Sequence, residues 1–113
     1  MTPYRKMIEI QVYQTARGKQ PYMDWLAKLN VQARLKVITA VGRLEEGNTS
    51  NLKGLGGGVS ELKINFGPGY RVYLGRQDGT FALLLGGGTK KRQSDDIALA
   101  KKHWQDYLAE RKG

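Results

Sequence analysis

The chain of 113 residues has no cysteine, a single histidine and few acids, with 10 Asp and Glu residues against 19 Lys and Arg residues. Without cysteine there are no disulfide bonds, thiolate metal sites or cysteine nucleophiles. One histidine makes a His-rich metal site or a two-histidine nuclease a poor fit. No apolar run reaches the roughly 20 residues that cross a bilayer, and residues 1–15 alternate unlike a signal peptide. We therefore expect a single cytoplasmic domain, residues 1–113, with no metal, no cofactor and no membrane partner.

The surplus of base gives a net charge of +9, which is typical of proteins that bind polyanions. Residues 47–94 hold seven bases and only two acids, whereas acids gather at Glu45-Glu46 and Asp95-Asp96. The surplus therefore lies in one part of the chain. Its bases are Lys53, Lys63, Arg71, Arg76, Lys90, Lys91 and Arg92.

Hydrophobic periodicity predicts the order of the elements. Period-two alternation or short apolar runs over 7–14, 59–66, 70–76 and 80–85 predict four strands. Helical spacing predicts helices over 21–29, from 31 to about 46, and from Ser94, a natural N-cap, towards the C-terminus. A loop rich in Gly, Asn and Ser is expected over 47–58. The order β-α-α-β-β-β-α predicts an α+β fold with a mostly antiparallel four-stranded sheet packed by helices. The second helix carries an apolar stripe, and such a stripe normally faces the core: Val31, Leu35, Ile38, Val41 and Leu44.

Turn signals set the expected strand pairing. Gly67-Pro68-Gly69 predicts a turn that places Phe66 opposite Tyr70, and Asp78-Gly79 predicts a two-residue hairpin turn. Gly86 to Gly88 are expected to let the chain bend out of the sheet. In this register one sheet face is apolar. The other carries a polar group that the basic loop after the last strand can join: Glu61, Lys63, Arg71 and Tyr73. The alternative is an ordinary solvated sheet face.

Four runs of sequence carry a resemblance. Residues 58–64 (GVSELKI), 67–73 (GPGYRVY), 84–90 (LLGGGTK) and 93–97 (QSDDI) resemble the HigB-like branch of the RelE/ParE toxin superfamily. These are the addiction-module killer proteins of type II toxin–antitoxin systems. The resemblance extends over roughly residues 7–107, and the Gly-Pro-Gly-Tyr-Arg-Val-Tyr run is its most specific part.

The resemblance implies a RelE/ParE-like fold and a toxin that stops translation as a ribosome-dependent endoribonuclease, an mRNA interferase. In such enzymes the ribose 2′-hydroxyl attacks the adjacent phosphate without a metal. It also implies a cognate antitoxin, expected to be a helix-turn-helix protein encoded next to this chain, beside mRNA and the ribosome as partners. The alternatives are a ParE-like inhibitor of DNA gyrase without nuclease activity, and a non-catalytic toxin-like repressor subunit.

Site residues carry over by position. Arg71 matches the arginine that stabilises the phosphate, Lys63 matches one of two strand lysines, and Lys90 or Lys91 lies where a cation faces the leaving group. Glu61 stands where the RelE pattern has its other lysine, and the last helix lacks an early Tyr. Glu61 is therefore either the base, with Tyr73 or a lysine as acid, or a structural partner of Lys63.

RNA binding is assigned to a second set of bases and rings. Tyr70, like Tyr73, offers a ring on which a base of single-stranded RNA can stack. The bases surround the predicted polar face. The set is Lys53, Tyr70, Arg76, Lys91 and Arg92.

Overall fold

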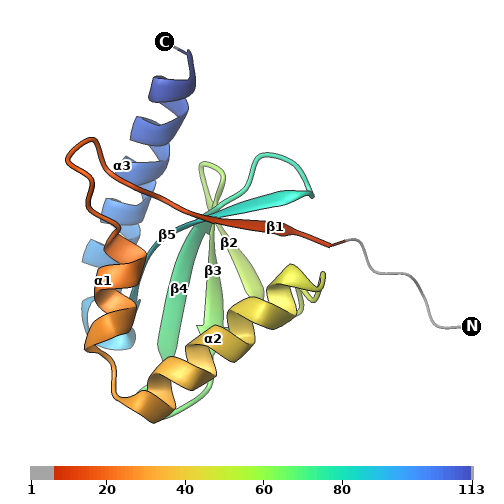
Figure 1. The fold of residues 1–113 in the computed structure, drawn as a ribbon, viewed down its shortest axis with the longest axis vertical. Helices are drawn as coiled ribbons and strands as arrows, with labels where there is room; N and C mark the ends of the chain where they lie inside the picture. The colour runs from red at the N-terminus through yellow and green to blue at the C-terminus, as the bar shows by residue number, and fades with distance from the viewer. Residues whose placement is uncertain (1–6, 113) are drawn as a thin grey trace, which may run out of the picture.

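Five strands, three helices and one short 3₁₀ helix follow one another in the computed structural model, which describes residues 7–112 (Figure 1). The predicted α+β class is confirmed. In chain order the elements are β1 (Glu9–Val12), α1 (Pro21–Lys28), α2 (Val31–Glu45), β2 (Leu52–Gly56), β3 (Val59–Ile64), β4 (Tyr70–Gly75), β5 (Phe81–Thr89), η1 (Lys90–Arg92) and α3 (Gln93–Lys112).

The strands form one mixed sheet in the order β1-β5-β4-β3-β2. Three neighbouring pairs are antiparallel, whereas β1 lies at one edge and runs parallel to β5. The predicted number of four strands is wrong, because residues 52–56 of the expected loop form the edge strand β2. Gly54 and Gly56 interrupt the alternation that would reveal this strand. Pairing with β3 holds β2 in place, with Leu52 opposite Leu62.

Helices cover both faces of the sheet (Figure 1). α1 and α2 pack on one face, over a core that contains Leu62, Val72 and Leu84. α3 packs on the other face, where the indole of Trp104 is buried beside Tyr73 and Leu85. Within residues 7–112, no helix is long and apolar enough to cross a membrane.

The buried face of α2 differs from the expected stripe. Ala33, Val37 and Leu44 are buried, whereas Val31, Leu35 and Ile38 are exposed. Both sets have helical spacing, so periodicity alone could not choose between them. The set that includes the small Ala33 lies against the sheet. Asn30 caps the start of α2, since its side-chain oxygen accepts a hydrogen bond from the Ala33 N–H at 2.9 Å.

The β3–β4 turn is longer than predicted, and the register moves by two residues. The Gly69 N–H donates to the Phe66 carbonyl at 2.9 Å, so Phe66 belongs to the turn and Ile64 lies opposite Tyr70. The predicted pairing of Phe66 with Tyr70 is therefore wrong. Side chains alternate with period two, so a two-residue shift leaves each on its predicted face. Lys63 now lies opposite Arg71, and Glu61 lies opposite Tyr73.

Three further predictions fail around β5. The β4–β5 connection is residues 76–80, in which the Asp78 carboxylate accepts the Thr80 N–H at 2.9 Å, and neither central residue of the expected turn has a positive φ. Gly86 to Gly88 stay in the strand. α3 begins at Gln93 rather than after a Ser94 cap, because η1 leads directly into it.

Candidate functional site

Arg71 is the most deeply buried base among the predicted site residues, with 8% of its surface exposed. It is the second residue of β4 and faces the side of the sheet that α3 covers. Its Nε lies 3.6 Å from Oε2 of Glu61 on β3. The same Oε2 accepts a hydrogen bond from the Gln93 amide of α3 at 3.3 Å. Glu61 therefore joins the arginine to the start of the last helix.

The Arg71 guanidinium is not fully hydrogen-bonded in the described structure. Among the described residues, neither Nε nor Nη1 has a hydrogen-bond partner, although both atoms are buried. A buried N–H donor without an acceptor lowers the stability of the fold, because it has lost its hydrogen bonds to water. An arginine fork suits phosphate and carboxylate oxygens. The guanidinium is therefore incompletely hydrogen-bonded, and its Nε has only the 3.6 Å contact with Glu61.

An open depression of about 350 Å³ lies beside Arg71, at the end of the sheet where the β3–β4 turn is. Three cations line it and no acid does. Its positive potential favours a phosphate group. The lining residues are Lys63, Asn65, Phe66, Gly67, Pro68, Gly69, Arg71 and Lys90.

Glu61 and Tyr73, the other two predicted catalytic residues, do not line this depression. Glu61 is 4% exposed and its ion partner is Arg71, not Lys63 as one reading had it. Tyr73 is 1% exposed, and burial, with the nearby Glu61 and Asp96 carboxylates, raises its pKa to about 12. Its hydroxyl has no hydrogen-bond partner in the described structure. Both side chains therefore lie beneath the surface that a substrate meets.

Sequence reasoning missed two side chains from the start of α3. Gln93 contacts Glu61, and Asp96 lies so close to β5 that a Cβ on Gly88 would be 2.1 Å from its Oδ2. Burial raises the pKa of the Asp96 carboxyl. Residues three apart on a helix share a face, and this spacing was the available signal.

The chain has 45% identity over 79 residues to a protein of Haemophilus influenzae. The match spans 69% of this chain and 80% of the relative, whose description is "Uncharacterized protein". The chain belongs to the family of this relative. No model of a known protein family matches the chain.

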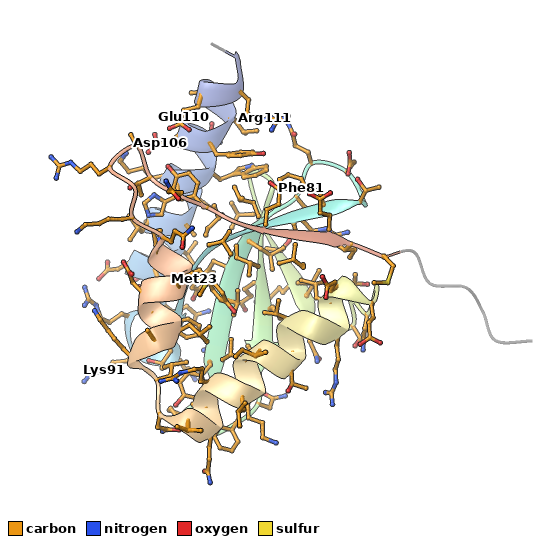
Figure 2. All side chains as sticks on the ribbon, in the orientation of Figure 1. Met23, Phe81, Lys91, Asp106, Glu110 and Arg111 are labelled. Carbon is orange, nitrogen blue, oxygen red and sulfur yellow. The ribbon has the colours of Figure 1, made fainter. Side chains whose placement is uncertain are left out.

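In this member of the family, the predicted RNA-binding residues are not all near the depression. Lys91 and Arg92 are exposed on η1, next to Lys90, and Lys53 is exposed on β2 opposite Glu61. Figure 2 shows Lys91 at the start of α3, with Asp106 and Glu110 near the far end of that helix. Lys91 and Arg92 therefore extend the positive surface beside Lys90, which lines the depression.

Two members of the RNA-binding set lie elsewhere. Tyr70 is buried on the α1 side of the sheet, its ring centroid 6.4 Å from that of Trp25, so it offers no free face to a base. Arg76 follows the far end of β4 and lines a different depression with Gly54 and Gly58. The buried Tyr73 ring is likewise closed to stacking. The prediction that these tyrosines stack on RNA is wrong for this conformation.

Metal ions in proteins are held by groups of His, Cys, Asp and Glu side chains. No three His, Asp or Glu side chains between residues 7 and 112 gather in a group that could hold a metal ion.

Proposed function

We propose that this chain is the toxin of a type II toxin–antitoxin module, of the HigB-like branch of the RelE/ParE superfamily, and cleaves mRNA on the ribosome. The observation that carries the proposal is the depression where Lys63, Arg71 and Lys90 meet without an acid. The resemblance of residues 58–97 to that branch supports it. Phosphoryl transfer needs cations at the phosphate, and these three supply them.

In the proposed reaction, the ribose 2′-oxygen attacks the adjacent phosphorus. A P–O2′ bond forms as the P–O5′ bond breaks, giving a 2′,3′-cyclic phosphate and a 5′-hydroxyl end. Arg71, whose side chain lines the depression, stabilises the charge on the phosphorane. Lys63 takes the 2′ proton and Lys90 donates a proton to the 5′-oxygen.

Glu61 acts as a positioning residue in this scheme. It is buried and holds Arg71 at 3.6 Å, so it lies behind the guanidinium rather than beside the substrate. Tyr73 is unsuited to be the general acid, because it is 1% exposed and does not line the depression. The two lysines of the depression remain for proton transfer.

The Glu61–Arg71 pair also favours a second candidate, a toxin-like subunit that binds but does not cleave. A carboxylate 3.6 Å from Arg71 offsets part of the positive charge that a phosphorane requires. Such a subunit would act with its antitoxin as a repressor. Cleavage assays separate the two candidates.

The test uses the purified full chain, ribosomes with a defined message in the decoding site, and mapping of the new 5′ ends. We expect cuts within the decoding site, with 5′-hydroxyl and 2′,3′-cyclic phosphate ends, in the Mg²⁺ buffer that keeps the ribosome intact. Intact message under these conditions would rule out the nuclease. A DNA damage response on expression, without loss of message, would favour the gyrase inhibitor.

A further inference from the structure

The outer face of α2 carries an apolar stripe that the fold does not bury. Val31 is 63% exposed, Leu35 58% and Ile38 47%. They recur at i, i+4 and i+7, so they lie in one row on the side of the helix opposite Ala33 and Val37. In Figure 1 this helix lies in front of the sheet, on the face away from α3. Single exposed apolar residues are ordinary, but an aligned row of three is typical of an interaction surface.

The charges near the stripe are mainly positive. Lys28 on α1 and Arg34, Lys36 and Arg43 on α2 are bases, whereas one acid, Glu45, ends α2 seven positions beyond Ile38. Beside Leu35 an open depression of about 470 Å³ is lined by Gln32, Lys36, Thr39 and Phe66. The Lys36 ammonium lies 5.5 Å from the centroid of the Phe66 ring. The stripe is therefore an apolar row with a basic border.

We propose that the outer face of α2 docks an acidic amphipathic helix of a partner protein. The row from residue 31 to residue 38 is about 10 Å long at 1.5 Å per residue, the length of two helical turns. A helix laid along it would place its own apolar residues between Val31, Leu35 and Ile38. Glutamates or aspartates on the edges of that helix would meet the four bases.

Charge and chemistry favour this occupant over others. A second copy of the chain would bring another +9 and the same four bases to the contact. RNA would meet the bases but would leave the three aliphatic side chains against water. An amphipathic acidic helix satisfies both features of the surface.

The docked helix would lie next to the anion-binding depression. Phe66 lines the depression beside Leu35 and also the one that contains Lys63, Arg71 and Lys90. Acidic side chains beyond the Phe66 edge would lower the positive potential there. This consequence, control of RNA access by the partner, rests on the proposed function, whereas the docking itself does not.

The test is an NMR titration of the ¹⁵N-labelled full chain with a synthetic peptide in the absence of RNA. The peptide is about 18 residues long, enough for an isolated helix, with leucines at helical spacing and glutamates between them. We expect amide shifts at millimolar peptide over α1, α2 and the β3–β4 turn. Leu35→Glu should weaken binding about tenfold or more. The change removes a leucine that the docked peptide would bury, and it adds a negative charge facing the acidic peptide.

The matched control is Leu99→Glu, because Leu99 on α3 is also a half-exposed leucine, at 51%. This variant should bind the peptide as the parent does. No shifts at millimolar peptide, or equal shifts with a scrambled peptide of the same composition, would overturn the proposal. So would Leu35-dependent binding to phosphatidylglycerol vesicles without peptide binding, or Leu35-dependent self-association on a sizing column. RNA cleavage is measured separately, so failure of the nuclease assay leaves this result intact.

Discussion

At the scale of single residues, Arg71 combines deep burial with unused donors. Its one charged partner in the described structure is Glu61, and Nε and Nη1 have no hydrogen bond. A buried cation is stabilised by complete hydrogen bonding. The hydrogen bonding of Arg71 is incomplete in the described residues.

Tyr73 has a buried hydroxyl without a hydrogen-bond partner, and it lies below the depression. Tyr73→Phe removes the unsatisfied hydroxyl and keeps the ring. We expect the free energy of unfolding to stay within about 1 kcal/mol of the parent or to rise. Message cleavage should be retained, because the proposed proton donor is Lys90. Denaturant unfolding and the ribosome assay measure the two effects. A loss of cleavage with normal stability would restore Tyr73 as the acid.

His103 lies on α3, its ring centroid 5.1 Å from that of Tyr13. Burial lowers the pKa of its imidazole below 6.5, and Lys102 lowers it further, while Asp106 opposes the change. Because the folded pKa is lowered, folding favours neutral His103. Its contribution to stability is complete above pH 6.5 and is lost as the pH falls through the folded pKa. The chain has one histidine, so one NMR titration gives the pKa directly. A value at or above 6.5 would contradict this environment.

At the scale of elements, close packing against α1 explains why β5 has a glycine where Trp25 contacts the strand. A Cβ on Gly87 would lie 2.3 Å from the Trp25 ring, whereas one on Gly86 would meet nothing within 4 Å. The helix α1 can therefore lie against β5 only where the strand has no side chain. This contact sets α1 on the sheet.

Gly87→Ala should lower the free energy of unfolding by about 1–3 kcal/mol, the usual cost of overpacking. Gly86→Ala, in the same strand, is the matched control and should change stability by no more than about 0.5 kcal/mol. Neither glycine has a positive φ, so backbone strain does not enter. Chemical denaturation of both variants checks the difference. Equal stabilities would show that Trp25 does not restrict β5.

Sequence patterns predicted much of this element order, and the failures have physical causes. Alternation placed Glu61, Lys63, Arg71 and Tyr73 on one face, which holds in the structure because a two-residue register error preserves faces. Alternation could not reveal β2, where glycines replace side chains. Likewise, helical spacing fitted two faces of α2, and only contact with the sheet selects Ala33 and Val37.

The candidate site was predictable in part. Lys63, Arg71 and Lys90 come from separate segments, and strand pairing brings them together as their order suggested. The burial of the Tyr70 and Tyr73 side chains could not be predicted from the sequence. It depends on the contact of Tyr70 with Trp25 and on the packing of α3 over Tyr73. The ion pair of Glu61 with Arg71 also depends on the true register. The roles of these residues in cleavage stay predictions.

At the scale of the whole molecule, charge is divided between the two faces of the sheet. The depression with Lys63, Arg71 and Lys90 adjoins η1 and the start of α3. The basic border of α2 lies on the other side of the sheet (Figure 1). The net charge of +9 thus contributes to two separate surfaces, which we propose bind a phosphate and an acidic partner.

Binding of single-stranded RNA should depend on salt through the three cations. About three phosphate contacts predict a slope of about −2 for log K against log salt concentration, at about −0.7 per contact. Lys63→Ala should make the slope shallower by about 0.7. Fluorescence anisotropy of a labelled RNA over a salt series gives both values. An unchanged slope in Lys63→Ala would remove that lysine from the RNA contact.

The central claim is that Arg71 stabilises the phosphorane, and the most direct test is the rate of message cleavage on the ribosome by Arg71→Ala. Loss of such a donor costs about 2–4 kcal/mol of transition-state stabilisation, which is roughly a 30- to 1000-fold slower rate. Arg17→Ala removes an equal charge from an exposed loop residue outside the depression and should cleave like the parent. Cleavage by a folded Arg71→Ala protein at the parent's rate would contradict the account.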